Sequence, residues 1–354
     1  MTGSDVAVAR VDCSTSKRSL RAPFRTALRE VTELEVVVVR VGWSDGTATA
    51  AAVSPTPPIT GETVGSIVAA ASGPLAAAVA GVPLDEHELL FRRLAAAMRG
   101  NTTAKCAVDL AVHTALAGRL GGLTAYLGAW LRPLHTDVTV SLATPEKMAE
   151  EARGRVEDGF DLLKLKVGGP DPGGDVARVR AVADAVGPTI GLRLDANQAW
   201  NAKGALAVLD GLERVGIRPE LVEQPVAAHD LAGMAAVTRY GSVPVLADES
   251  VHSAHDVVRV AEAGAADMVN VKLAKCGGLR AARDVVAAAE ACGLGVVVGS
   301  MLEPAGTVAA AVALALTLPD RRAHDLDASW WSGSTDVEVR PPTVQLASTS
   351  GTVS

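Results

Sequence analysis

Apolar and polar residues follow two different patterns in the first third of the chain. Residues 1–60 hold two runs rich in β-branched residues, VAVARVDC and LEVVVVRVGWSDG, and the second ends at an Asp-Gly turn signal. Residues 61–128 instead repeat apolar residues with helical spacing in three segments, which are 61–81, 85–100 and 103–122. We therefore predict an α+β domain over residues 1–128.

From about residue 136 onwards, short apolar runs alternate with amphipathic segments. Eight of these runs read as buried strands, at 138–143, 160–167, 189–196, 219–225, 243–249, 266–274, 294–301 and 323–329. Eight strands that alternate with helices are what a closed (β/α)8 barrel requires. We expect an α/β protein with this TIM-type barrel over residues 129–330, and we expect residues 331–354 to return to the first domain.

Composition narrows the class of protein. The chain of 354 residues has a net charge of −7 and no basic run, which argues against a nucleic-acid partner. Its start lacks a signal-peptide pattern and its apolar stretches are too short or too polar to span a bilayer, so we expect a cytoplasmic protein with no membrane partner. Cys13, Cys106, Cys276 and Cys292 lack metal-ligand spacing, and we expect free thiols.

Charged residues recur where the predicted strands end. Asp195 ends GLRLD, Glu223 ends ELVE, and Asp248 follows VPVLA, while Lys166 and Lys272 hold the same position upstream and downstream. Successive members are 24 to 29 residues apart, the length of one βα unit. Because the carboxyl ends of barrel strands face one mouth, the five side chains should share one pocket.

Three carboxylates in one pocket favour a Mg²⁺ site, since Mg²⁺ prefers oxygen ligands and keeps positions open for water or substrate. A coordinated substrate carboxylate would make the neighbouring α-proton easier to remove. A lysine acts as a base only when neutral, and we expect Mg²⁺, the second ammonium group and desolvation to favour that form. Lys166 and Lys272 lie on opposite sides of the carboxylates in strand order, so they could address opposite faces of one carbon.

The motifs KLKVGG, LRLDANQAW, LVEQPV, LADES and VNVKLAKCGGL, in this order, resemble the enolase superfamily, muconate-lactonizing enzyme subgroup. The resemblance covers almost the whole chain and implies an N-terminal capping domain. It implies Mg²⁺ held by the three carboxylates, with the two lysines as an acid/base pair that acts through a metal-stabilised enolate. It also implies that Lys164 contacts the substrate carboxylate, and that Asn197 and Glu249 support the metal ligands without touching the ion.

The eighth predicted strand favours one reaction within the subgroup. Asp325 and Asp327 are two residues apart in HDLDAS, so on a strand both side chains would point into the mouth. Two carboxylates there suit a substrate ammonium group, and the pair is similar to that of the dipeptide epimerases, where it binds the free amino terminus. The segment GSMLE is similar to the same family's seventh-strand segment, which implies that Ser300 and Met301 contact substrate.

The first domain carries signals for the substrate side chain. PFRTALRE resembles the capping loop of L-Ala-D/L-Glu epimerases, in which the position of Arg29 meets the distal carboxylate of the Glu side chain. SPTPPITGE is similar to their second specificity loop. The sequence departs from its relatives at Ala52, where a Glu is common, and at Pro304, where a small hydroxyl residue is common.

We therefore expect an isomerase that epimerises the second residue of a dipeptide, L-Ala-D/L-Glu, from peptidoglycan turnover. Its cofactor would be Mg²⁺, its partner a small dipeptide, and its assembly a homo-oligomer. N-acylamino acid racemases, o-succinylbenzoate synthases and muconate-type cycloisomerases share the five central residues and remain alternatives. A non-catalytic barrel is a further alternative, although a scaffold would not need both lysines.

Overall fold

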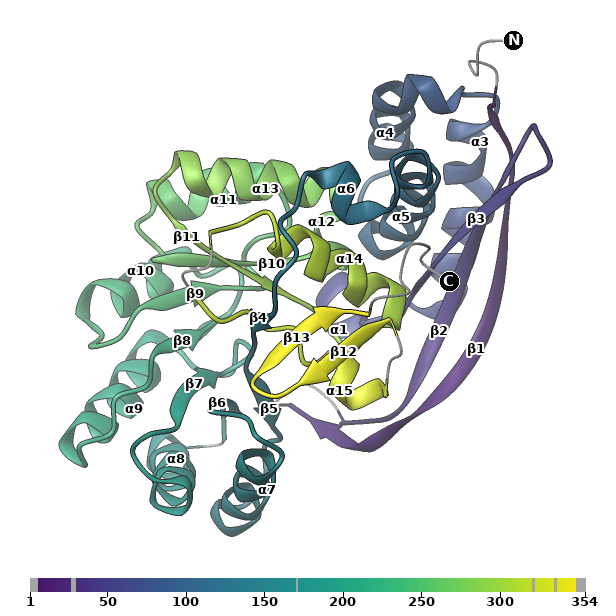
Figure 1. Cartoon of the computed structure of the whole chain (residues 1–354). Coiled ribbons are helices and arrows are strands. Elements are labelled where there is room, and N and C mark those ends of the chain that lie inside the picture. Colours follow the sequence, from purple (N-terminus) through teal and green to yellow (C-terminus); the bar gives the residue numbers. More distant parts are fainter. Residues whose placement is uncertain (1–5, 27–29, 170, 320–321, 334–335, 348–354) are drawn as a thin grey trace.

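The computed structural model describes residues 6–26, 30–169, 171–319, 322–333 and 336–347. Figure 1 shows an N-terminal α+β part, coloured purple and blue, beside a curled parallel sheet that is ringed by helices and coloured teal to green. The expected α/β class, a barrel with an N-terminal α+β domain, is thereby confirmed. The domain boundaries at residues 128 and 330 stay a prediction.

The N-terminal sheet is antiparallel and has the strand order β1-β2-β3. Its strands are β1 (Val8–Arg25), β2 (Glu30–Trp43) and β3 (Ala48–Val53). β1 continues well beyond the apolar run that predicted it, through the exposed and polar segment STSKRS. This extension pairs with β2 from Ser14↔Val38 to Ser19↔Glu33, so backbone hydrogen bonds rather than an apolar pattern maintain it.

Six α-helices follow the sheet: α1 (Pro57–Thr60), α2 (Val64–Ala70), α3 (Ala76–Val79), α4 (His87–Ala96), α5 (Thr102–Gly118) and α6 (Leu123–Leu127). The segment expected as one helix at 61–81 is divided, because α2 and α3 are separated by a π-helical turn, Ala71–Leu75. Pro74 lies in this turn and has no N–H for the α-helical ladder. A short 3₁₀ turn, Leu84–Glu86, precedes α4.

Seven parallel strands form the barrel wall in the order β11-β10-β9-β8-β7-β6-β5. They are β5 (Val138–Val140), β6 (Leu162–Lys166), β7 (Gly191–Asp195), β8 (Leu221–Glu223), β9 (Val245–Ala247), β10 (Met268–Lys272) and β11 (Gly295–Gly299). The helices between and after them are α7 (Pro145–Glu157), α8 (Pro172–Val186), α9 (Ala202–Arg214), α10 (Leu231–Tyr240), α11 (Ala254–Glu262), α12 (Leu273–Cys276), α13 (Leu279–Ala291) and α14 (Ala305–Ala315). The strands are almost wholly buried, as helices on the outer face require.

The eighth predicted strand, 323–329, is wrong as a regular strand. The segment makes only two isolated parallel bridges, Thr136↔His324 and Gly299↔Asp325, which close the ring between β11 and the chain entering β5. Helix α15 (Ala328–Ser332) begins directly afterwards, and Asp327 is its N-cap with helical φ and ψ of −78° and −6°. The extended backbone therefore ends after Asp325, because α15 begins at Ala328, inside the segment that was predicted to be a strand.

The described C-terminal segment adds two strands, β12 (Val337–Arg340) and β13 (Thr343–Leu346). β13 pairs with β4 (Leu134–His135), where the chain enters the barrel, as the yellow strands of Figure 1 show. Across the described ranges, no helix is both long and apolar enough to cross a membrane.

Two buried carboxylates of the N-terminal domain bind helix N-termini: Asp109 joins this domain to the barrel, and Glu62 joins the segment after α1 to α5. Asp109 of α5 accepts hydrogen bonds from the backbone N–H of Leu279 (2.6 Å) and Arg280 (3.4 Å) at the start of α13. Glu62, which follows α1, accepts from the N–H groups of Thr103 and Ala104 at the start of α5, at 2.8 and 3.0 Å. Both carboxylates satisfy helix N-termini that carry no cap of their own.

Candidate functional site

The five charged residues expected at strand ends lie together at one mouth of the barrel. Lys166 pairs in register with Asp195, and Asp195 pairs with Glu223, so these three end β6, β7 and β8 at one level. Asp248 follows β9 directly, and Lys272 ends β10. All five are buried, with exposed fractions of 6% or less. The periodic spacing in the sequence therefore corresponds to one cluster in space.

Lysine ammonium groups lie between the carboxylates. The Nζ of Lys166 donates to Asp195 Oδ2 at 2.5 Å, and the Nζ of Lys272 donates to Asp248 Oδ2 at 2.8 Å. Lys272 is also 3.8 Å from Glu223 Oε1. Within the residues that the structure describes, no group of three His, Cys, Asp or Glu side chains is arranged to hold a metal ion. The carboxylates are paired with lysines rather than with one another.

The donor set nevertheless fits a magnesium ion by its chemistry. Asp195, Glu223 and Asp248 are buried oxygen donors on neighbouring strands, which is what Mg²⁺ prefers. Burial and the charge of Asp195 raise the pKa of Glu223 to about 7, so this carboxyl lacks sufficient positive charge around it. The ammonium groups of Lys272 and Lys275 outweigh the effect of burial on Asp248 and lower its pKa. A divalent cation would supply the charge that Glu223 lacks.

Ion pairs favour the protonated form of two lysines in the site, Lys272 and Lys164. Burial lowers the pKa of Lys272, but the contacts with Asp248, Asp325 and Glu223 outweigh it and raise this pKa well above its usual value. The pKa of Lys164 is raised for the same reason, with Asp325 as the largest contributor after burial. Direct ion pairs exceed the desolvation penalty for Lys164 and Lys272. The neutral amine was expected with Mg²⁺ bound beside it, so that expectation stays a prediction.

Strained backbone follows two of the carboxylates. Asn197 and Gln224 have positive φ angles of 43° and 34°, which side-chain-bearing residues rarely adopt. This turn lets the N–H of Asn197 donate to Asp195 Oδ1 at 2.9 Å, while its Nδ2 donates to Glu249 Oε1 at 3.3 Å. Gln224 Oε1 accepts from the N–H of Asp248 at 3.0 Å. The strand ends are therefore fixed to one another.

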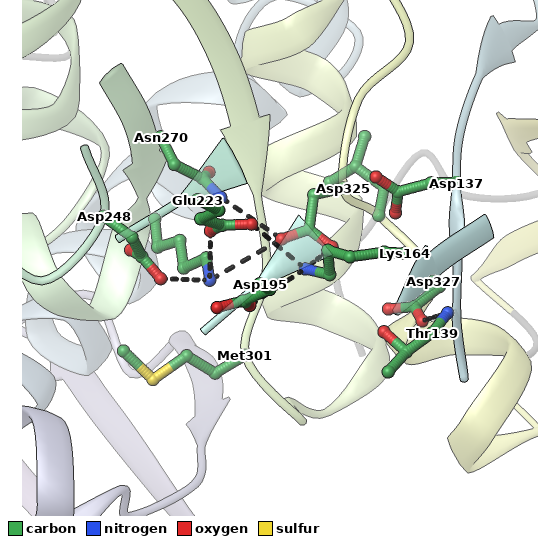
Figure 2. Close-up of polar contacts among 12 residues, drawn as sticks. Asp137, Thr139, Lys164, Asp195, Glu223, Asp248, Asn270, Met301, Asp325 and Asp327 are labelled. Carbon is green, nitrogen blue, oxygen red and sulfur yellow. Dashed lines mark hydrogen bonds and ion pairs between the residues drawn. The ribbon is translucent and has the colours of Figure 1, made fainter. Parts of the chain in front are cut away.

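Asp325 and Asp327 line the same pocket from different backbone settings: Asp325 forms a β-bridge with Gly299, and Asp327 is the N-cap of α15. Asp325 Oδ1 lies 2.6 Å from the Nζ of Lys164, so the lysine expected to contact substrate pairs here with the expected ammonium ligand (Figure 2). Asp327 Oδ2 accepts from the N–H of Thr139 at 2.8 Å and from Nε1 of Trp331 at 3.0 Å. Both carboxylates line the cavity, as expected. The expected reason, that residues two apart on a strand share one face, does not apply, because the backbone is helical at Asp327.

The charged cluster opens into a cavity lined by residues of both the N-terminal domain and the barrel. Ser300 and Met301, both expected to contact substrate, are among its lining residues, and Ser300 Oγ is buried without a hydrogen-bond partner among the described residues. The N-terminal domain contributes Phe24, Thr26, Thr56, Pro58 and Ile59 to the lining. Arg29 lies outside the described residues.

Three buried polar residues of the site were not assigned from the sequence. Lys275 is fully buried and donates to both the carboxylate and the carbonyl of Asp248. Asn270 and Asp137 lie deeper in the barrel, and burial together with Asp325 raises the pKa of Asp137 to about 8. Asn270 carried a usable signal, because it precedes Lys272 by two residues and must share its strand face.

Comparison with known protein families divides the chain as the fold does. Residues 9–126 match the family described as mandelate racemase / muconate lactonizing enzyme, N-terminal domain. Residues 147–349 match the family described as enolase C-terminal domain-like. The two matches together include every strand of the barrel after β5 and all of the N-terminal sheet except Val8.

Individual relatives agree with these families. The chain is 38% identical over 323 residues to an L-Ala-D/L-Glu epimerase from Bacillus subtilis (strain 168), covering 91% of this chain and 88% of the relative. A substrate-liganded complex of the L-Ala-D/L-Glu epimerase from Bacillus subtilis superposes with a TM-score of 0.92 at 36% identity, covering 96% of both chains. A dipeptide epimerase from Cytophaga hutchinsonii, complexed with Mg and D-Ala-L-Val, gives a TM-score of 0.90 at 28% identity, covering 96% and 93%. The chain belongs to the enolase superfamily, in its mandelate racemase and muconate lactonizing enzyme division, and is an isomerase.

Proposed function

We propose that the chain is a Mg²⁺-dependent dipeptide epimerase that inverts the α-carbon of the second residue by a two-lysine 1,1-proton transfer. The observation that carries the proposal is the position of Lys166 and Lys272 at opposite ends of one row of carboxylates, in a cavity that also presents Asp325 and Asp327. The dipeptide epimerases among its relatives support this assignment.

Asp195, Glu223 and Asp248 would hold the metal ion. When bound, Mg²⁺ would draw electron density from the substrate carboxylate and make the α-proton more acidic. Lys166 and Lys272 would lose their ion pairs with Asp195 and Asp248 when these carboxylates hold the ion, and an amine released in this way could act as a base. One lysine then removes the α-proton from one face while the other delivers a proton to the opposite face.

The substrate's ammonium group would bind at Asp325 and Asp327. Asp325 is buried beside Lys164 and Lys272, which outweigh burial and lower its pKa, so it remains a carboxylate. Thr139 and Trp331 hold Asp327 Oδ2 and thereby fix the orientation of its carboxyl group. A buried carboxylate pair gains most from a ligand that brings its own positive charge. This chemistry favours a free dipeptide over an N-acyl amino acid.

We propose L-Ala-D/L-Glu as the preferred substrate, as in the Bacillus subtilis relative. The proposal requires Arg29 to meet the Glu side chain as a forked donor. An apolar second residue is the alternative that the lining favours, because Phe24, Pro58, Ile59 and Met301 all contribute apolar groups. Arg29→Ala should lower kcat/KM for L-Ala-L-Glu by about 10- to 100-fold, the value of a charge-assisted contact, and should spare L-Ala-L-Leu.

The proposed activity can be tested directly with dipeptide pools in D₂O. Each pool is incubated with the protein and Mg²⁺, and mass spectrometry detects the gain of one deuteron at the epimerised carbon. L-Ala-L-Glu should exchange, whereas its N-acetyl derivative should not, since acetylation removes the ammonium group. Preferred exchange of the acetylated compound would instead indicate an N-acylamino acid racemase, and exchange that persists after exhaustive chelation would contradict the metal requirement.

A further inference from the structure

Asn270 lies between a proposed metal ligand, Glu223, and a proposed ligand of the substrate ammonium group, Asp325. It precedes Lys272 by two residues on β10, so both side chains face the barrel interior. Its Nδ2 donates to Glu223 Oε1 at 2.8 Å and to Asp325 Oδ2 at 3.2 Å (Figure 2). Its side chain is fully buried. One amide therefore joins a proposed metal ligand to a proposed ammonium ligand.

A neutral amide suits this position better than other side chains. Two N–H groups satisfy one oxygen of each carboxylate and reduce their mutual repulsion without adding a charge. A lysine in place of Asn270 would add a positive charge that competes with both the metal ion and the substrate ammonium group. A leucine would leave an oxygen of Glu223 and an oxygen of Asp325 without this donor, at the cost of buried unsatisfied acceptors.

Gly299 provides the space that brings these groups together. It is the register partner of Lys272 on the neighbouring strand β11. A Cβ at Gly299 would lie 2.4 Å from Asn270 Oδ1, 2.9 Å from Lys272 Cε and 3.0 Å from Asp325 Oδ2. Any larger residue would therefore displace Asn270 or its neighbours, so the amide depends on a glycine across the ladder.

We propose that Asn270 is a positioning residue that fixes the spacing between Glu223 and Asp325. It thereby sets the distance between the point where the substrate carboxylate is held and the point where its ammonium group is held. The inference rests on the proposed dipeptide substrate, in which one peptide unit separates the two charges, whereas a free amino acid carries both on one carbon. Asn270 would thus contribute to the selection of dipeptides over free amino acids.

The test compares Asn270→Leu with the wild-type protein and with Val271→Ala. Val271 is equally buried on the same strand, but alternation points its side chain to the opposite face, so it controls for general damage to β10. Mn²⁺ affinity is measured by electron paramagnetic resonance without substrate. Calorimetry with Mg²⁺ then gives the Kd values of L-Ala-L-Glu and its N-acetyl derivative.

Asn270→Leu should weaken Mn²⁺ binding by roughly 10-fold and L-Ala-L-Glu binding by roughly 10-fold, because a charge-assisted hydrogen bond is lost on each side. Its preference for the free over the acetylated dipeptide should also fall, while Val271→Ala should keep wild-type values. Wild-type Mn²⁺ affinity in Asn270→Leu, or equal losses in both variants, would overturn the inference.

Gly299→Ala gives a second test that retains the amide and only displaces it. It should weaken both affinities in the same direction, and unchanged affinities in a folded Gly299→Ala protein would also overturn the inference. A wild-type protein that binds Mn²⁺ but no dipeptide would refute the proposed function. The Mn²⁺ measurements would still decide whether Asn270 positions Glu223, so the two failures are distinguishable.

Discussion

Lys166 and Lys272 lie at opposite ends of a row of three carboxylates, each paired with the outermost one on its own side. Lys166 is 2.5 Å from Asp195 on β7, and Lys272 is 2.8 Å from Asp248 beside β9. If each lysine serves one face of the substrate carbon, Lys166→Ala should abolish α-proton exchange from one epimer and leave exchange from the other measurable. Lys272→Ala should show the reverse.

Deuterium incorporation from D₂O into L-Ala-L-Glu and L-Ala-D-Glu, followed separately by NMR, checks this pattern. Lys203→Ala is the control, because Lys203 is an exposed lysine on α9. A single-base mechanism would instead show one variant inactive towards both epimers and the other unaffected. Wild-type exchange in both variants would remove the lysines from the chemistry.

Lys275 is a structural partner of the proposed metal ligand Asp248. Its buried Nζ contacts the carboxylate and the carbonyl of Asp248 and donates to the carbonyl of Asn270 at 3.1 Å. Lys275→Met should cost roughly 3 kcal/mol in the free energy of unfolding, since it removes one partner of a buried charge. The freed carboxylate should also bind Mg²⁺ more weakly, by about 10-fold or more.

Urea denaturation measures the first effect and isothermal titration calorimetry the second. Lys203→Met, on the exposed face of α9, should change neither quantity. A Lys275→Met protein with wild-type Mg²⁺ affinity would mean that Lys272 alone is sufficient to orient Asp248.

The strand-end charges could be predicted because each follows an apolar run, and because parallel strands bring such positions to one edge. Lys275 could not be recognised in the same way, since a lysine one turn into a short helix normally faces solvent. The exposed half of β1 also gave no signal, because its polar residues are held by pairing with β2 rather than by burial. The end of the extended backbone after Asp325 depends on tertiary contacts, including the indole of Trp331 on Asp327.

Asp109 couples the N-terminal domain to the barrel helix α13. It accepts from the N–H of Leu279 at 2.6 Å, and its Oδ1 lies 3.0 Å from Nδ1 of His113. Asp109→Ala should lower the free energy of unfolding by about 1–2 kcal/mol, as expected for loss of an N-cap. It should also increase hydrogen exchange at the start of α13, because the cap comes from the other domain.

Asn201→Ala is a suitable comparison for Asp109→Ala. Asn201 caps its own helix α9 by accepting from the N–H of Gly204 at 2.9 Å, so this contact stays within one domain. Both variants should lose similar stability, but only Asp109→Ala should raise exchange across the domain contact. Equal exchange at α13 in the two variants would refute the coupling role.

Glu303 makes the stability of the fold depend on pH. Its carboxyl group is buried and accepts from the N–H of Met301 at 3.3 Å, the one donor to it among the described residues, and desolvation raises its pKa from 4.5 to about 7. The folded protein therefore keeps this proton up to about pH 7, whereas the unfolded chain releases it near pH 4.5. Unfolding releases a proton in this window, so the contribution of Glu303 to the free energy of unfolding falls as pH rises.

Glu303→Gln removes that titration and keeps the shape and an acceptor for Met301. Relative to wild type, the variant should gain up to about 3 kcal/mol in the free energy of unfolding between pH 4.5 and pH 8, since one pKa unit corresponds to about 1.4 kcal/mol. Urea denaturation of both proteins at several pH values measures the difference, and Glu213→Gln on the exposed face of α9 is the control. A constant difference between Glu303→Gln and wild type across this range would show that Glu303 is already ionised at low pH, and that Lys272 or a solvent path compensates its burial.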